Sequence, residues 1–180
     1  MTPTTPPRAQ LHAPLSPDKA ARWARFGHWE ETLFPNVVGL VLEEVRTDYS
    51  RLVLPYRPEL RQPAGVVHGG AIATLIDVCV VPALAGIYDE VPVLLTIDMQ
   101  IRFLSAAKET DLIGEGWVTR RGRSVAFCQA EVRRENDNEV VAEGWLVYKI
   151  SQRSPKTPII AGGPAGDERT QGNGVPKRSR

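Results

Sequence analysis

The sequence has few cysteines and no long uninterrupted hydrophobic run. Only Cys79 and Cys128 occur among 180 residues, both in apolar stretches without metal or redox spacing. We therefore expect reduced core thiols in a cytoplasmic protein and no metal site. The longest apolar stretch, residues 71–87, is interrupted by Asp77 and Pro82, which argues against a membrane span.

The sequence also has little net charge, formally +1. The segment after residue 151 carries a charge of +4, so the rest of the chain is slightly acidic. A slightly acidic charge over residues 1–151 argues against nucleic acid as the main ligand. Hydrophobic residues make up 42% and charged residues 24%, a balance typical of a globular chain.

Composition divides the chain into three parts. Residues 1–16 are rich in proline, and residues 152–180 form a basic tail rich in proline and glycine, so we expect both segments to be disordered. The length of the intervening residues 17–151 suits one domain.

Apolar periodicity predicts the elements of this domain. A short helix is expected at residues 18–33, and strands at 37–47 and 49–56. Residues 71–86 form a helix that is apolar nearly all round, which is typical of a buried helix. The remaining predicted strands cover residues 94–105, 111–120, 124–134 and 139–150.

The first of these four strands alternates apolar with polar residues, the pattern of a strand with one buried face. The order of the elements is strand, strand, buried helix and four antiparallel strands. The simplest packing wraps one curved antiparallel sheet around the long buried helix. We therefore predict an α+β structure with the hotdog fold and an extra N-terminal helix.

Gly69 and Gly70 open the predicted buried helix. Backbone N–H groups at a helix start lack intrahelical acceptors, and the helix dipole is positive there, so the position suits an oxyanion. Glycine also allows an acyl group to approach the backbone closely. A tight turn into a packed helix would explain the same pair of glycines.

Asp77 is the one charged residue on this otherwise apolar helix. A buried carboxylate is costly unless it is paired, so its presence favours a general base or a nucleophile. Thr74 lies three residues earlier on the same helix face. A structural Asp bonded to Thr74 or to a neighbouring backbone group is the alternative.

The spacing of Gly69 and Asp77 constrains any shared site. Eight residues separate them, or roughly 12 Å along one helix at about 1.5 Å per residue. One carbonyl group cannot contact both. If both act on one substrate, they come from different subunits, and two antiparallel helices about a two-fold axis would form two equivalent sites.

The same segment carries a recognisable motif. Its residues are, in order, Gly65, His68, Gly69, Gly70, Leu75 and Asp77. Their spacing resembles the signature of hotdog-fold acyl-CoA thioesterases of the phenylacetyl-CoA (PaaI) type, which are related to 4-hydroxybenzoyl-CoA thioesterases. The resemblance covers roughly residues 37–149. It implies hydrolysis of an acyl-CoA to free acid and CoA, with no cofactor because CoA is part of the substrate.

The resemblance also implies catalytic roles for five residues. The Gly69 amide would polarise the thioester carbonyl, and Asp77 would attack it or activate a water molecule. Gln62 would help to hold the substrate or the water. His68 would orient the loop, with a direct proton transfer as the alternative. A hydroxyl on the strand after the helix positions the water in some relatives, and Thr96 is the nearest match.

Further residues are expected to bind substrate. Gly70 and Thr74 adjoin the catalytic candidates on the helix. Arg121, Gly122 and Arg123 form the tip of a predicted hairpin, which the family often places near the CoA phosphates. Arginine suits bidentate phosphate contacts, although a solvated basic turn would have the same sequence.

Two other functions are compatible with this fold. A non-catalytic hotdog protein would bind acyl-CoA or lipid without turnover. A hydratase of this fold pairs its Asp with a downstream His, and no His follows His68. A thioesterase acting as a homodimer or a dimer of dimers is the favoured interpretation.

Overall fold

Six strands form one antiparallel sheet in the computed structural model, which describes residues 7–151. The predicted basic tail, residues 152–180, lies outside the described residues. The strand order in the sheet is β1-β2-β4-β5-β6-β3. The strands are β1 (Val41–Arg46), β2 (Tyr49–Leu54), β3 (Val93–Phe103), β4 (Leu112–Arg121), β5 (Val125–Arg134) and β6 (Val140–Ser151).

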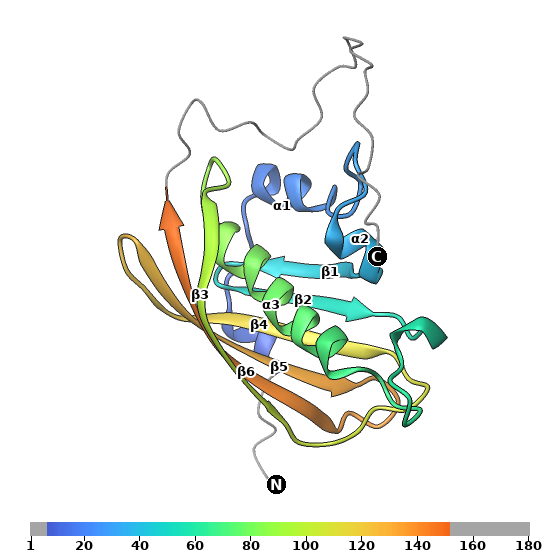
Figure 1. The fold of residues 1–180 in the computed structure, drawn as a ribbon. Helices are drawn as coiled ribbons and strands as arrows, with labels where there is room; N and C mark the ends of the chain where they lie inside the picture. The colour runs from blue at the N-terminus through green and yellow to red at the C-terminus, as the bar shows by residue number, and fades with distance from the viewer. Residues whose placement is uncertain (1–6, 152–180) are drawn as a thin grey trace, which may run out of the picture.

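The long helix α3 (Gly69–Ala85) lies across the concave side of this curved sheet (Figure 1). The predicted hotdog fold with an additional N-terminal helix is therefore confirmed. The shorter helical elements are η1 (Arg8–Leu11), α1 (Pro17–Trp23), α2 (Phe34–Val38) and η2 (Pro58–Leu60).

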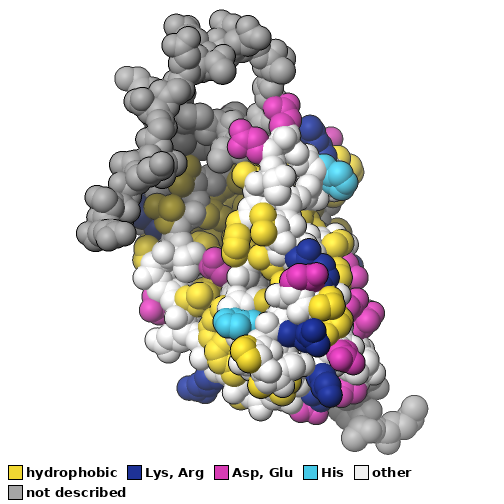
Figure 2. All heavy atoms as spheres, turned by 45° about the vertical axis from the view of Figure 1, so that its right-hand side comes forward, with side chains coloured by type: hydrophobic (Ala, Val, Ile, Leu, Met, Phe, Trp, Pro, Cys, Tyr) yellow, Lys and Arg dark blue, Asp and Glu magenta, His cyan; other side chains and the backbone are white. Residues whose placement is uncertain are grey.

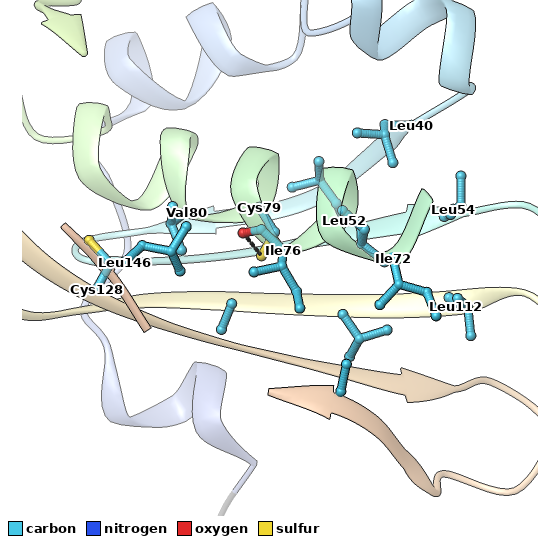
Figure 3. Close-up of a cluster of buried hydrophobic side chains, with 14 of the residues drawn as sticks. Leu40, Leu52, Leu54, Ile72, Ile76, Cys79, Val80, Leu112, Cys128 and Leu146 are labelled. Atoms are coloured by element: carbon cyan, nitrogen blue, oxygen red, sulfur yellow. Dashed lines mark hydrogen bonds between the residues drawn. The ribbon is translucent and has the colours of Figure 1, made fainter. Parts of the chain in front are cut away.

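The hydrophobic core fills the layer between α3 and the sheet (Figure 3). Leu75, Ile76 and Cys79 of α3 are fully buried there. A Cβ atom at Gly144 of β6 would lie 2.5 Å from the Ile76 side chain, so this glycine lets the helix approach the sheet closely.

Basic and acidic side chains lie interspersed with hydrophobic ones on the face shown in Figure 2. This mixture agrees with the small net charge of the chain. Among residues 7–151, no helix combines the length and the hydrophobicity needed to cross a membrane.

A side chain from β2 supports α3 where proline interrupts it. Pro82 has no backbone N–H, yet α3 continues to Ala85. The next N–H, that of Ala83, donates to Ser50 Oγ at 3.1 Å, and the Ser50 hydroxyl donates to the Cys79 carbonyl oxygen. The buried Ser50 hydroxyl therefore bridges a donor and an acceptor four residues apart in the helix.

The N-terminal helix is shorter than predicted. We expected residues 18–33, but α1 ends at Trp23 and is followed by a turn in which Gly27 has a φ of 82°. This left-handed conformation, which glycine adopts readily, prevents the helix from continuing. The strand expected at 37–47 begins only at residue 41, because α2 occupies the preceding segment and ends at Val38, with Gly39 as its C-cap at a φ of 85°.

The expected disorder of residues 1–16 is wrong for residues 7–16. The guanidinium of Arg8 lies 3.6 Å from the ring centre of Trp117, and His12 stacks on Tyr49 at 5.3 Å. A backbone bridge also joins this segment to the end of β1. These cation–π and aromatic contacts order the segment in spite of its proline content.

The expected burial of one face of β3 is also wrong in the single chain. Three of its apolar side chains are largely exposed, Ile97 at 57%, Met99 at 40% and Phe103 at 55%. The physical reason is position, because β3 is an edge strand of the sheet and pairs only with β6.

The Ser50 bridge leads to a prediction about stability. Ser50→Ala leaves the Ala83 N–H and the Cys79 carbonyl without this partner in a buried environment, so the free energy of unfolding should fall by about 1–3 kcal/mol. Denaturant unfolding measures the change. Ser124→Ala, at an exposed turn, is the control and should stay within about 0.5 kcal/mol of the wild type. Equal stability of the two variants would contradict the bridge.

Candidate active site

The side chain of Asp77 is held by two hydroxyl groups. The Thr96 hydroxyl donates to Oδ1 of Asp77 at 2.9 Å, and the Tyr148 hydroxyl donates to the same oxygen at 2.5 Å. Tyr148 also lies within hydrogen-bond distance, 2.8 Å, of the Asp77 main-chain oxygen. Among residues 7–151, no side-chain or backbone group donates to Oδ2. One carboxylate oxygen is therefore held and the other is available.

A β-bulge places the two hydroxyls together. Thr96 of β3 and Tyr148 of β6 are direct cross-strand partners, and the register then shifts between Thr96 and Asp98. The extra residue, Ile97, brings Thr96 to the same face of the sheet as Met99, the partner of the buried Leu146, which simple alternation along the strand would not do. Thr96, expected from the sequence to position a water molecule, thus lies within hydrogen-bond distance of the helix carboxylate.

Tyr148 is a site residue that sequence reasoning missed. Its side chain is 2% exposed, and burial together with the charge of Asp77 raises its pKa well above the ordinary value for tyrosine. It therefore stays protonated and can donate. The available signal was its place between Leu146 and Ile150, which share the inward face of the last strand.

The start of α3 distinguishes the two motif glycines. His68 is the N-cap residue, and its Nδ1 accepts the Gly70 N–H at 2.8 Å. The Gly69 N–H has no acceptor among the described residues 7–151. The ring of Phe103 lies 3.3 Å from the position of a Cβ atom at Gly69. Gly69 thus presents a free donor, whereas the Gly70 donor is used to cap the helix.

Thr74 and Gln62 lie near this helix start without contacting Asp77. The Thr74 hydroxyl donates to the Gly70 carbonyl at 2.9 Å, so the alternative of a Thr74–Asp77 bond is not found. Gln62 belongs to the loop before α3, where its N–H donates to the Val66 carbonyl at 2.9 Å. This loop is tied to the helix by the His68 N–H, which donates to the Leu60 carbonyl at 2.7 Å.

Arg121 holds the other end of α3. Its guanidinium donates to the Leu84 carbonyl at 2.9 Å and to the Tyr88 hydroxyl at 3.1 Å, and it pairs with Asp48 at 2.5 Å. A cation at a helix C-terminus satisfies free carbonyls and the negative end of the dipole. The Arg121 guanidinium is therefore already bonded to groups of its own chain.

Gly122 and Arg123 are exposed at the tip of the β4–β5 hairpin. Arg123 lines a cavity of about 790 Å³ together with residues 88–92 and Ile150. Of the two hairpin arginines proposed from sequence, Arg123 therefore faces open space. Asp89 and Glu90 lie in the same lining, so the cavity carries both signs of charge.

The chain thus carries two separated halves of a reactive centre. The free N–H group lies at the first residue of α3, and the carboxylate lies eight residues later, roughly 12 Å away at about 1.5 Å per residue. An amide donor of this kind can stabilise an oxyanion. A half-buried carboxylate with one free oxygen can take a proton from water or attack a carbonyl carbon.

Comparison with known proteins agrees with this fold. Protein SSO1253 of Saccharolobus solfataricus, whose name proposes an esterase, is 28% identical over 127 residues, which are 67% of this chain and 80% of the relative. The E. coli PaaI protein, from the phenylacetic acid degradation operon, superimposes with a TM-score of 0.66 at 15% identity, covering 74% of this chain and 94% of PaaI. Thioesterase HI1161 of Haemophilus influenzae superimposes with a TM-score of 0.61 at 18% identity, covering 69% of this chain and 94% of HI1161.

The similar structures and the sheet around one long helix define a hotdog protein. Residues 64–141, which include the motif, α3 and most of the following strands, match the family model described as Thioesterase superfamily. The match covers less than half of the chain, and it supports a hydrolase activity without naming the acyl group.

The contacts of the two hairpin arginines predict different effects on stability. Arg121→Ala removes the partners of the Leu84 carbonyl and Asp48, so the free energy of unfolding should fall by about 1–3 kcal/mol. Arg123→Ala is the matched control from the same turn, and it should change stability by less than about 0.5 kcal/mol. Thermal and denaturant unfolding measure both. A stable Arg121→Ala protein would show that this contact does not hold α3.

Proposed function

We propose that this protein hydrolyses an acyl-CoA thioester to the free acid and CoA, at sites formed between two subunits of a homodimer. The observation that carries the proposal is the separation of the free Gly69 N–H from the Asp77 carboxylate on one helix. Each chain supplies both groups, yet one thioester cannot contact both in the same chain. Two chains related by a two-fold axis would bring each donor to the partner's carboxylate.

In the proposed reaction, the thioester oxygen lies against the Gly69 N–H of one subunit, which stabilises the negative charge of the tetrahedral intermediate. Oδ2 of Asp77 from the other subunit takes a proton from water as the water attacks, or attacks the carbonyl carbon itself to form an anhydride that water opens. The C–S bond breaks in both routes, and the sulfur leaves as CoA thiolate, which takes up a proton.

The exposed edge of the sheet supports a two-chain site. β3 carries Thr96 beside Asp77, and its Phe103 ring packs against Gly69. The same strand exposes Ile97, Met99 and Phe103 and has a free hydrogen-bonding edge. Exposed apolar surface of this kind marks interaction sites, and free edges favour pairing with another chain. A second copy covering β3 would bury these side chains next to both halves of the centre.

For substrate binding, we propose that Gln62 and His68 shape the loop in front of the Gly69 amide, with Gly70 and Thr74 on the adjoining turn of α3. Arg123 and Gly122 are the candidates for the CoA phosphates, because Arg123 lines an open cavity. Arg121 would contribute indirectly, by holding the end of α3 beside that cavity.

Removal of the free carboxylate oxygen tests the reaction. Asp77→Asn keeps the shape of the side chain but cannot accept a proton from water, so hydrolysis should fall by about a hundred- to ten-thousandfold. Release of free thiol from aryl-, short- and long-chain acyl-CoAs measures the rate. Asp18→Asn, an exposed carboxylate in the first turn of α1, is the control and should retain wild-type rates. Acyl-CoA binding without turnover by the wild type would instead favour a non-catalytic binding protein.

Complementation between two inactive variants tests the shared site. Gly69→Pro removes the N–H but suits the first position of a helix, and the φ of −65° and ψ of 135° at His68 are compatible with a following proline. Gly69→Ala adds a similar contact to Phe103 while keeping the N–H, so it is the matched control and should retain more activity. Gly69→Pro alone should lose at least about a hundredfold.

Co-expressed in equal amounts, the Gly69→Pro and Asp77→Asn chains should regain about a quarter of wild-type activity, because half of the dimers are mixed and each mixed dimer has one intact site. The activity of the co-purified mixture, compared with each variant alone, measures the recovery. A mixture as inactive as its components, in samples where mixed dimers are present, would place both groups in one chain.

A further inference from the structure

We propose that Tyr148 is the positioning residue of Asp77, whose hydroxyl fixes Oδ1 so that Oδ2 is the reacting oxygen. The inference rests on the proposed thioester hydrolysis. It starts from an asymmetry in the carboxylate, since both hydroxyl donors, Tyr148 and Thr96, bond to the same oxygen. Because the carboxylate oxygens are chemically equivalent in water, only such contacts distinguish them in the protein.

Tyr148 is suited to this role by its anchoring. Its ring lies in the core and its side chain is 2% exposed, so the hydroxyl has little freedom to move. The hydroxyl is also within 2.8 Å of the Asp77 main-chain oxygen, so it contacts both the side chain and the backbone of the same residue. This pair of contacts limits rotation of the carboxylate about its own side-chain bonds.

Thr96 differs from Tyr148 in exposure. Thr96 lies on the exposed edge strand, beside the bulge residue Ile97. In the proposed dimer it lies near the surface that the second chain covers, where it can also contact water or substrate. Tyr148 lies on the buried face of β6, and its hydroxyl contacts Asp77. It therefore acts through the carboxylate, which defines a positioning residue.

Tyr148→Phe tests the proposal, with Tyr49→Phe as the matched control. Tyr49 is also a buried tyrosine whose hydroxyl donates to a carboxylate, that of Glu115, at 2.5 Å, but it lies beneath His12 of the N-terminal segment and away from Asp77. We expect Tyr148→Phe to lower kcat by about ten- to a hundredfold with KM changed by less than about threefold. Tyr49→Phe should leave kcat and KM unchanged.

The outcomes separate this inference from the proposed function. A wild-type protein without thioesterase activity overturns both. An active wild type and an inactive Asp77→Asn, together with a folded Tyr148→Phe that keeps its kcat, overturn the positioning role alone. Equal losses in Tyr148→Phe and Tyr49→Phe would show a general effect of stability and also overturn it. Thr96→Val, which removes the other donor to Oδ1, should also lower kcat.

Discussion

The structure depends on one costly feature, a carboxylate on a helix that is otherwise almost entirely apolar. A charge in such a place is tolerated only where hydrogen-bond donors meet it. The fold supplies them from two neighbouring strands, as Thr96 of β3 and Tyr148 of β6, which are opposite each other in the sheet. The β-bulge lies directly after Thr96, the residue of β3 that donates to the Asp77 carboxylate. Satisfying one carboxylate oxygen in this way leaves the other free for chemistry.

The same helix is fixed along its length by polar contacts as well as by the core. His68 caps its start, the Ser50 hydroxyl bridges its backbone next to Pro82, and Arg121 satisfies a carbonyl at its end. Each contact comes from a different part of the chain. A helix held at three points keeps the Gly69 N–H and Asp77 at a constant separation, and this separation makes a two-chain site necessary in the proposed reaction.

Sequence reasoning predicted the core elements well because their periodicity is strong. The apolar run of α3 and the four later strands were located to within one or two residues. It failed where local geometry or a neighbour decides the outcome. The φ of 82° at Gly27 shortened the N-terminal helix, and contacts to Trp117 and Tyr49 ordered a segment that its proline content predicted to be disordered. The exposure of Phe103 was missed because alternation does not tell an edge strand from a central one.

The sequence by itself determined that one carboxylate lies on a buried helix and that a glycine pair opens that helix, since both follow from residue order and the helical rise. It also determined their separation, because distance along a helix depends on residue number alone. Only the tertiary structure decided which oxygen of Asp77 is held and that Tyr148 holds it. Thr96 and Tyr148 lie far from Asp77 in the chain, and their contacts with it depend on strand register and on one bulge that no local pattern encodes.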